Sequence, residues 1–165
     1  MHISLYDCGL FPLNKIIPSI IQKLDWKNSF ISILTQNEEM VYDVDKFLWT
    51  FTPLLFIPHA TIYDNTEIQK HSPIIIAHQQ EIITSLHRQK QWHSIAINCI
   101  PADVSDILKA KENTEDHIVF VLNSESAVTD NFDDLKKNMI ETLKNMTYPF
   151  RWWIFDNNNW SLKSE

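Results

Sequence analysis

The side chains whose types could support acid–base or metal chemistry are the carboxylates and the histidines. Four carboxylates crowd one predicted helix, at Glu38, Glu39, Asp43 and Asp45. Acidic residues near the start of a helix stabilise its dipole without taking part in a reaction, and we interpret this group in that way. The seven histidines are scattered, and no two of them have the four-residue spacing of a helical metal-binding pair. The sequence therefore predicts no catalytic residue and no metal ligand.

The glycine content limits the cofactors that the chain could hold. The sequence contains one glycine, Gly9. Nucleotide-binding folds usually hold phosphate on a glycine-rich turn, because only glycine lets backbone N–H groups approach the anion so closely. Neither common phosphate-loop pattern, nor the glycine-flanked serine of a nucleophile elbow, can be written with a single glycine. We therefore predict that the protein has no nucleotide cofactor and no active site of its own.

The composition is that of a folded protein with an acidic charge balance. The 165 residues are 44% hydrophobic and 21% charged, which is ordinary for a soluble domain, and the net charge of −7 argues against a protein that grips duplex DNA by itself. No apolar run approaches the roughly 18 residues of a membrane span, and the N-terminus lacks the basic region of a signal peptide. Cys8 and Cys99 have no metal-ligand or redox-motif spacing. We expect a reduced, cytoplasmic setting without membrane contact.

Strand and helix patterns alternate along the chain, and these elements must position any functional side chain. The predicted strands are residues 3–6, 29–34, 55–57, 73–77, 94–98, 117–122 and 151–155, and the predicted helices are residues 14–24, 37–49, 81–88, 102–111 and 130–146. Several strands are apolar throughout, as in strands covered on both faces. The pattern predicts an α/β fold with a mainly parallel sheet, helices on both faces and a Rossmann-like topology that lacks a phosphate-binding loop. We expect a single domain over residues 1–160 and a frayed tail over residues 161–165.

The segment from residue 47 to residue 60, FLWTFTPLLFIPHA, joins a predicted helix to a predicted strand. A capping box of Thr35 and Glu38 is expected to start the helix, and Pro18 of the preceding helix is expected to lie in a first turn capped by Asn14. Core packing accounts for most of the apolar residues of the segment. It does not account for Trp49 or His59, which we expect at a surface edge where they could dock a partner.

The spacing of Trp49, Phe56 and the Pro58–His59 pair resembles the chi subunit of bacterial DNA polymerase III. Members of that family carry a Leu-Trp motif that ends the second helix, an aromatic residue seven positions later, and then a Pro-His pair. The resemblance extends to the first strand, the first helix and the C-terminal end, with Tyr6, Pro18, Trp152, Trp153, Asp156 and Trp160. It is weakest over residues 78–116, where residues 79–93 resemble an insertion.

The resemblance implies a non-catalytic accessory subunit of the clamp-loader part of the replicase. Such subunits bind the acidic, phenylalanine-ended C-terminal tail of single-stranded DNA-binding protein (SSB), and in many bacteria they also bind a small psi subunit. Contact with DNA would then be indirect. By resemblance, the tail site lies on the C-terminal helix and the psi-type docking surface comprises Leu48, Trp49 and Phe56.

The C-terminal helix carries a pattern that suits an acidic peptide. Lys137, Ile140 and Lys144 are spaced three and seven residues apart, which places a basic–apolar–basic stripe on a face separate from the core. Lys136 is adjacent, and Arg151 starts the last predicted strand. Family members usually carry an aromatic residue at the position of Ile140 and often a basic one at the position of Glu141, so we expect weaker and more salt-sensitive binding of the tail.

Two other classes of function stay open at this point. One is an enzyme that acts on nucleotides or nucleic acid through an unorthodox site, which the shortage of glycine disfavours. The other is direct binding of single-stranded DNA through exposed tryptophans, on which bases could stack. The acidic net charge weighs against the second.

Overall fold

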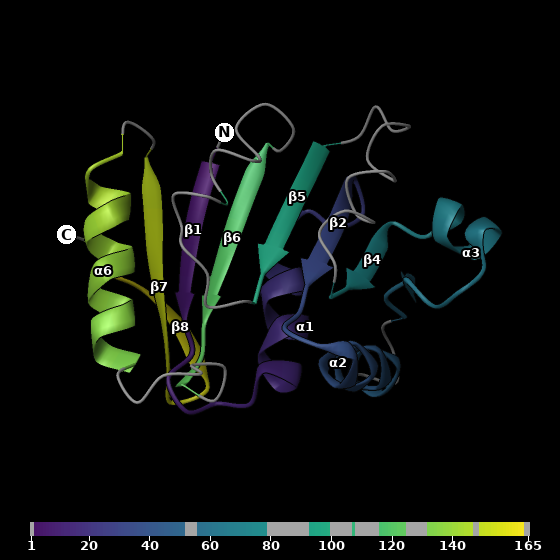
Figure 1. The fold of residues 1–165 in the computed structure, drawn as a ribbon, viewed down its shortest axis with the longest axis horizontal. Helices are drawn as coiled ribbons and strands as arrows, with labels where there is room; N and C mark the ends of the chain where they lie inside the picture. Colours follow the sequence, from purple (N-terminus) through teal and green to yellow (C-terminus); the bar gives the residue numbers. More distant parts are fainter. Residues whose placement is uncertain are drawn as a thin grey trace.

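The computed structural model describes residues 2–51, 56–78, 93–99, 107, 116–124, 132–146 and 149–163. Within these residues, one sheet has the strand order β3-β4-β2-β5-β6-β1-β7-β8 (Figure 1). The strands are β1 (His2–Asp7), β2 (Ser29–Leu34), β3 (His59–Thr61), β4 (Ile74–Ala77), β5 (His93–Asn98), β6 (His117–Leu122), β7 (Phe150–Asp156) and β8 (Asn159–Lys163). The helices are α1 (Leu13–Lys23), α2 (Glu38–Thr50), α3 (Thr66–His71) and α6 (Phe132–Lys144).

The sheet is parallel from β3 to β7, and β8 pairs with β7 in the antiparallel direction. The strands predicted at residues 29–34 and 117–122 are confirmed with those bounds, and the other central strands shift by only one or two residues. Their continuous apolar runs follow from burial on both faces, since an alternating pattern would leave one face polar.

The two faces of the sheet are covered by different helices. One core cluster joins the inner faces of α1 and α2 to the sheet, and a second joins Met139 and Leu143 of α6 to Leu5, Phe120 and Trp152 on the opposite face. Figure 1 shows α6 beside β7 at one end of the sheet, and α3 beyond β4 at the other. The predicted α/β fold with helices on both faces is confirmed. None of the helices within the described residues is long and apolar enough to cross a membrane.

The starts of the first two helices differ from the prediction. In α2 the cap is Asn37, whose side chain accepts a hydrogen bond from the Met40 N–H at 2.9 Å, and the Thr35 hydroxyl instead donates to backbone carbonyls. The predicted capping box is therefore wrong. Helix α1 begins at Leu13 without a side-chain cap, so Asn14 is not its cap, and Pro18 lies inside the helix rather than in its first turn.

The segment after α2 also differs from the prediction. No strand forms at Phe56 and Ile57. The short strand β3 begins at His59, after Pro58, and Leu55 is outside the described residues. The buried residues of α2 are Val41, Val44 and Leu48, whereas Met40 and Phe47 are only partly buried.

The C-terminal end forms a β-hairpin that the sequence analysis did not predict. Asn157 and Asn158 have positive φ values of 48° and 61°, which is the turn geometry that joins β7 to β8. Residues 161–163, expected to belong to a frayed tail, continue β8. The helices predicted at residues 81–88 and 102–111, the cap at Asp130 and the insertion at 79–93 fall almost wholly outside the described residues.

Candidate functional site

A shallow groove beside α6 brings together most of the residues predicted to bind a peptide tail. This lysine groove has a volume of about 360 Å³ and is lined by Asp133, Lys136, Lys137, Ile140, Glu141, Lys144 and Trp152. The lysines fall on one side because residues three, four and seven apart share a helix face. The lining joins cationic groups on α6 to an apolar floor on β7.

The floor of the lysine groove is the indole ring of Trp152. The residue is 6% exposed, and among the described residues its buried Nε1–H has no hydrogen-bond partner. Lys163 Nζ lies 4.1 Å from the centroid of this ring, and Lys136 Nζ lies 5.6 Å from it. Ammonium groups over an indole face are attracted by its quadrupole. The cationic character of the groove therefore extends from α6 across Trp152 to β8.

Lys136 of the lysine groove forms an ion pair within the protein. Its Nζ forms an ion pair with Asp7 Oδ2, and the side chains are 29% and 5% exposed. Asp7 also accepts a hydrogen bond from the Gly9 N–H at 3.3 Å. This pairing weakens the case for Lys136 as a contact of an anionic ligand. Lys137 and Lys144 of α6 are candidates because they line the groove, and Lys163 of β8 is one because it lies over Trp152.

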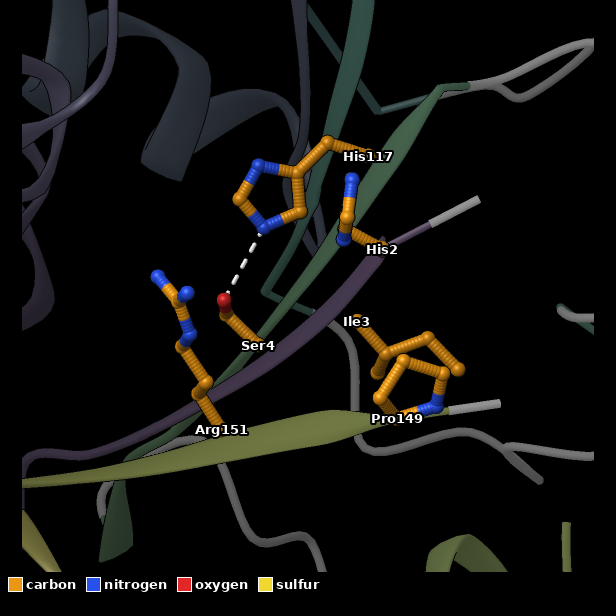
Figure 2. A pocket seen from close by; sticks show the side chains of 6 residues that line it. All are labelled: His2, Ile3, Ser4, His117, Pro149 and Arg151. Atoms are coloured by element: carbon orange, nitrogen blue, oxygen red, sulfur yellow. Dashed lines mark hydrogen bonds between the residues drawn. The ribbon is translucent and has the colours of Figure 1, made fainter. Parts of the chain in front are cut away.

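Arg151, also predicted for the peptide site, lies in a different pocket. This amino-end pocket is lined by His2, Ile3, Ser4, His117, Pro149 and Arg151, has a volume of about 380 Å³ and lies where β1, β6 and β7 begin (Figure 2). Successive residues of a strand point to opposite faces of the sheet. Because Trp152 faces α6, Arg151 faces the other side, and the structure does not bring it to the lysine groove.

A second surface gathers exposed aromatic rings at the end of α2. Trp49 and Phe56 are 57% and 60% exposed, and their ring centroids are 5.3 Å apart. We call the exposed residues Tyr42, Trp49, Phe56, Tyr63 and Ile68 the aromatic patch; they line a cavity of about 520 Å³. The surface position expected for Trp49 is therefore confirmed.

His59 and Leu48 support the aromatic patch from inside and do not form its outer surface. His59 is 7% exposed; its Nδ1 donates to the Ile57 carbonyl at 2.7 Å, and its ring centroid lies 5.1 Å from that of Trp49. Its Nε2 lies 3.2 Å from Asp45 Oδ1 but lacks hydrogen-bond geometry. The surface position expected for His59 is wrong. Leu48 is 2% exposed and belongs to the core, so it cannot contact a partner directly.

The family comparison matches most of the chain. The model of the family described as "DNA polymerase III chi subunit, HolC" matches residues 3–131. The chain belongs to the DNA polymerase III chi subunit family. The suspected membership is thereby confirmed, and it assigns the chi-family chain an accessory role in the replicase. The comparison with curated proteins gives no match.

Of the two candidate surfaces of this chi-family chain, the family match covers only the aromatic patch. It includes the aromatic patch and ends one residue before α6. The assignment of the lysine groove therefore depends on its geometry and chemistry rather than on the family match.

The amino-end pocket contains a serine–histidine contact that resembles a nucleophile and its base. Ser4 Oγ and His117 Nε2 are 2.9 Å apart (Figure 2). Ser4 is only 4% exposed and lies in the middle of β1, so a reacting atom could not approach its hydroxyl as nucleophilic attack requires. Burial, with the neighbouring charges of His2, His93 and Arg151, lowers the pKa of His117 to about 4. Within the described residues no group of three potential metal ligands occurs.

Sequence reasoning missed three features of these sites: the contribution of Trp152, the position of Lys163 over it, and the pairing of Lys136 with Asp7. The adjacent tryptophans Trp152 and Trp153 could have signalled the first, because one of them must face each side of the sheet. The other two depend on strand order, which local spacing does not reveal.

Proposed function

We propose that this chi-family chain binds the acidic C-terminal tail of SSB in the lysine groove and so links SSB to the replicase. The observation that carries the proposal is the combination of three unlike features at one place. The lysine ammonium groups come from α6 and from β8, and the apolar ring of Trp152 lies between these two elements. In the part of the chain that the structure describes, the buried N–H of this indole has no hydrogen-bond partner. A peptide that ends in an aromatic residue with a free carboxylate can satisfy all three.

The proposed mode of binding follows from the positions of the groups. The terminal phenylalanine ring packs on Trp152 and Ile140, because these are the apolar members of the lining. The terminal carboxylate lies between Lys144 and Lys163, which line one continuous depression with Met146, Pro149 and Phe150. The aspartates of the tail lie along α6 toward Lys137. Charge-assisted hydrogen bonds of this kind contribute about 1.5–3 kcal/mol each when they are made in place of water contacts.

The acidic members of the lining moderate the expected affinity. Asp133 and Glu141 face the same groove, and Lys136 is neutralised by Asp7. Since exposed charges are screened over about 10 Å at 0.1 M salt, we expect binding of micromolar strength that weakens clearly as salt is added.

We also propose that the aromatic patch docks a helical partner of the clamp loader, such as a psi-type subunit. Exposed tryptophan and tyrosine side chains carry much of the binding energy in protein interfaces. Stacked Tyr42 and Tyr63, with ring centroids 5.3 Å apart, extend the surface next to Trp49 and Phe56. The described lining of this cavity contains no lysine or arginine, but it contains Asp45 and Asp64. This charge disfavours the phosphate backbone of single-stranded DNA as the occupant.

The test of the tail site is peptide binding measured by fluorescence anisotropy, with an acidic peptide that ends in Ile-Pro-Phe. The double charge reversal Lys137→Glu with Lys144→Glu is expected to abolish binding. The matched control is Lys15→Glu with Lys27→Glu, which changes the net charge equally at exposed positions outside the groove lining. Wild-type binding by the groove variant, or equal loss in both variants, would contradict the assignment.

A titration with oligo-dT at low salt separates the proposal from direct DNA binding. We expect no saturable quenching of tryptophan fluorescence at protein concentrations that saturate the peptide. Tight binding of oligo-dT, lost on Trp49→Ala, would replace the partner-docking proposal with a DNA-binding one.

A further inference from the structure

The amino-end pocket has no role in the tail or partner proposals, and its chemistry differs from both. Its residues come from the starts of three neighbouring parallel strands. In the pairing register His2 lies opposite His117, and Ser4 lies opposite Arg151. Paired residues of a sheet point to the same face, so these four side chains converge on one side (Figure 2).

All four of these side chains can donate hydrogen bonds. Ser4 and His117 share one hydrogen bond at 2.9 Å. If the imidazole accepts it, the other ring nitrogen of His117 carries a proton that can be donated to a ligand. In this tautomer the buried Ser4 hydroxyl fixes the imidazole and does not itself contact the ligand. Arg151 adds a planar fork of donors from β7 and is exposed.

Among the described residues, no acidic side chain lines the pocket beside these donors. None of its six lining residues is acidic, and within the described part of the chain Arg151 forms no ion pair. Asp116 is the acidic residue that directly precedes His117 in the sequence. Its carboxylate accepts from the Ser94 N–H at 2.9 Å and lies 3.3 Å from His93 Nδ1, so it is directed toward β5. An uncompensated guanidinium beside two imidazoles is unusual on a chain with a net charge of −7.

We propose that the amino-end pocket binds a phosphate monoester, with the dianionic group held by Arg151 and by the imidazole donors of His2 and His117. Donors from three strands can reach at least three oxygens of a tetrahedral phosphate, whereas a carboxylate presents two oxygens in one plane. The volume of about 380 Å³ exceeds that of the phosphate group and so leaves room for the ester substituent. This assignment is independent of the tail proposal, because Arg151 and the lysine groove lie on opposite faces of the sheet.

The test is an NMR titration of the histidine C2 protons in the full chain, with phenyl phosphate, inorganic phosphate and acetate as probes. Sodium chloride keeps the ionic strength constant. We expect saturable shifts of the His2 and His117 signals with phenyl phosphate, smaller ones with inorganic phosphate, and none of comparable affinity with acetate.

Variants of the protein test whether phenyl phosphate binds in the amino-end pocket. Arg151→Gln is expected to weaken phenyl phosphate binding by about tenfold, the loss of one charge-assisted contact, and Arg151→Lys by less. Lys144→Gln, on the opposite face, is the control and should bind phenyl phosphate as the wild type does. Binding of the acidic peptide that ends in Ile-Pro-Phe should be weakened by Lys144→Gln and left unchanged by Arg151→Gln. Shifts that do not saturate, equal weakening in Arg151→Gln and Lys144→Gln, or tighter binding of acetate would each overturn the proposal.

Discussion

The ion pair between Lys136 and Asp7 predicts a stability effect that most surface lysines would not show. The Asp7 side chain is 5% exposed, and Lys136 is its ion-pair partner from α6. Replacing Lys136 by Met keeps the aliphatic contacts but leaves a buried carboxylate with only the Gly9 N–H at 3.3 Å. Breaking a fully buried pair costs about 3–5 kcal/mol.

The expected cost here is smaller because Lys136 is itself 29% exposed and the carboxylate retains one donor. We therefore expect Lys136→Met to lower the free energy of unfolding by about 2–3 kcal/mol, a value scaled down from that of a fully buried pair. Lys137→Met, one residue away and exposed, should stay within about 0.5 kcal/mol.

The assay is urea unfolding followed by circular dichroism, on the wild type, Lys136→Met, Asp7→Asn and the double variant. The double variant should lose less stability than the two single variants together, by about 1–2 kcal/mol, because Asn leaves no charge to pair. A loss below about 0.5 kcal/mol for Lys136→Met, or strict additivity in the cycle, would refute the reasoning. It would also return Lys136 to the set of lysines available to a peptide.

Two further predictions concern His117 and the aromatic patch. The folded-state pKa of His117 is lowered from 6.5 to about 4, so below pH 6.5 the unfolded chain takes up a proton that the folded chain refuses until about pH 4. Stability should therefore fall as the pH decreases across this window; at about 1.4 kcal/mol for each pKa unit the ceiling is about 3 kcal/mol, and partial solvent exposure reduces it to about 1–2 kcal/mol. His117→Gln should flatten the curve of unfolding free energy against pH in this window, and an unchanged slope would contradict the assignment. At the aromatic patch, Leu48→Ala should cost about 2–5 kcal/mol in urea unfolding, because it opens a cavity in the core. Trp49→Ala and Phe56→Ala should each cost less than about 1 kcal/mol while weakening partner binding; a large stability loss in either would place that ring in the core.

The buried part of the fold was predictable because its sequence pattern is local. Apart from Ser29, Ser32 and His117, the strands Ser29–Leu34 and His117–Leu122 carry apolar residues on both faces, a pattern that is typical of strands covered on both sides. Helix α6 was predictable from its core stripe, of which Met139 and Leu143 are buried. The same periodicity placed Lys137, Ile140 and Lys144 together on the helix, and the structure confirms that these residues line one groove.

The remaining features depend on pairing between distant parts of the chain. The position of Arg151 relative to the groove follows from the face on which Trp152 lies, and the run Trp152–Trp153 gives no local reason to prefer either face. The pairing of Asp7 with Lys136 requires α6 to pack over β1, which the order of elements along the chain does not reveal. The hairpin β7–β8 is not predicted from the sequence, because it depends on positive φ values at both Asn157 and Asn158 and on pairing of the strands that flank them.

The most direct test of the proposed link to SSB is a pulldown of SSB by the full chain, with intact SSB and with SSB that lacks its C-terminal tail. We predict that intact SSB is retained, that tail-deleted SSB is not, and that Lys137→Glu with Lys144→Glu loses intact SSB whereas Lys15→Glu with Lys27→Glu keeps it. Retention of the tail-deleted protein at the level of the intact one would contradict the account.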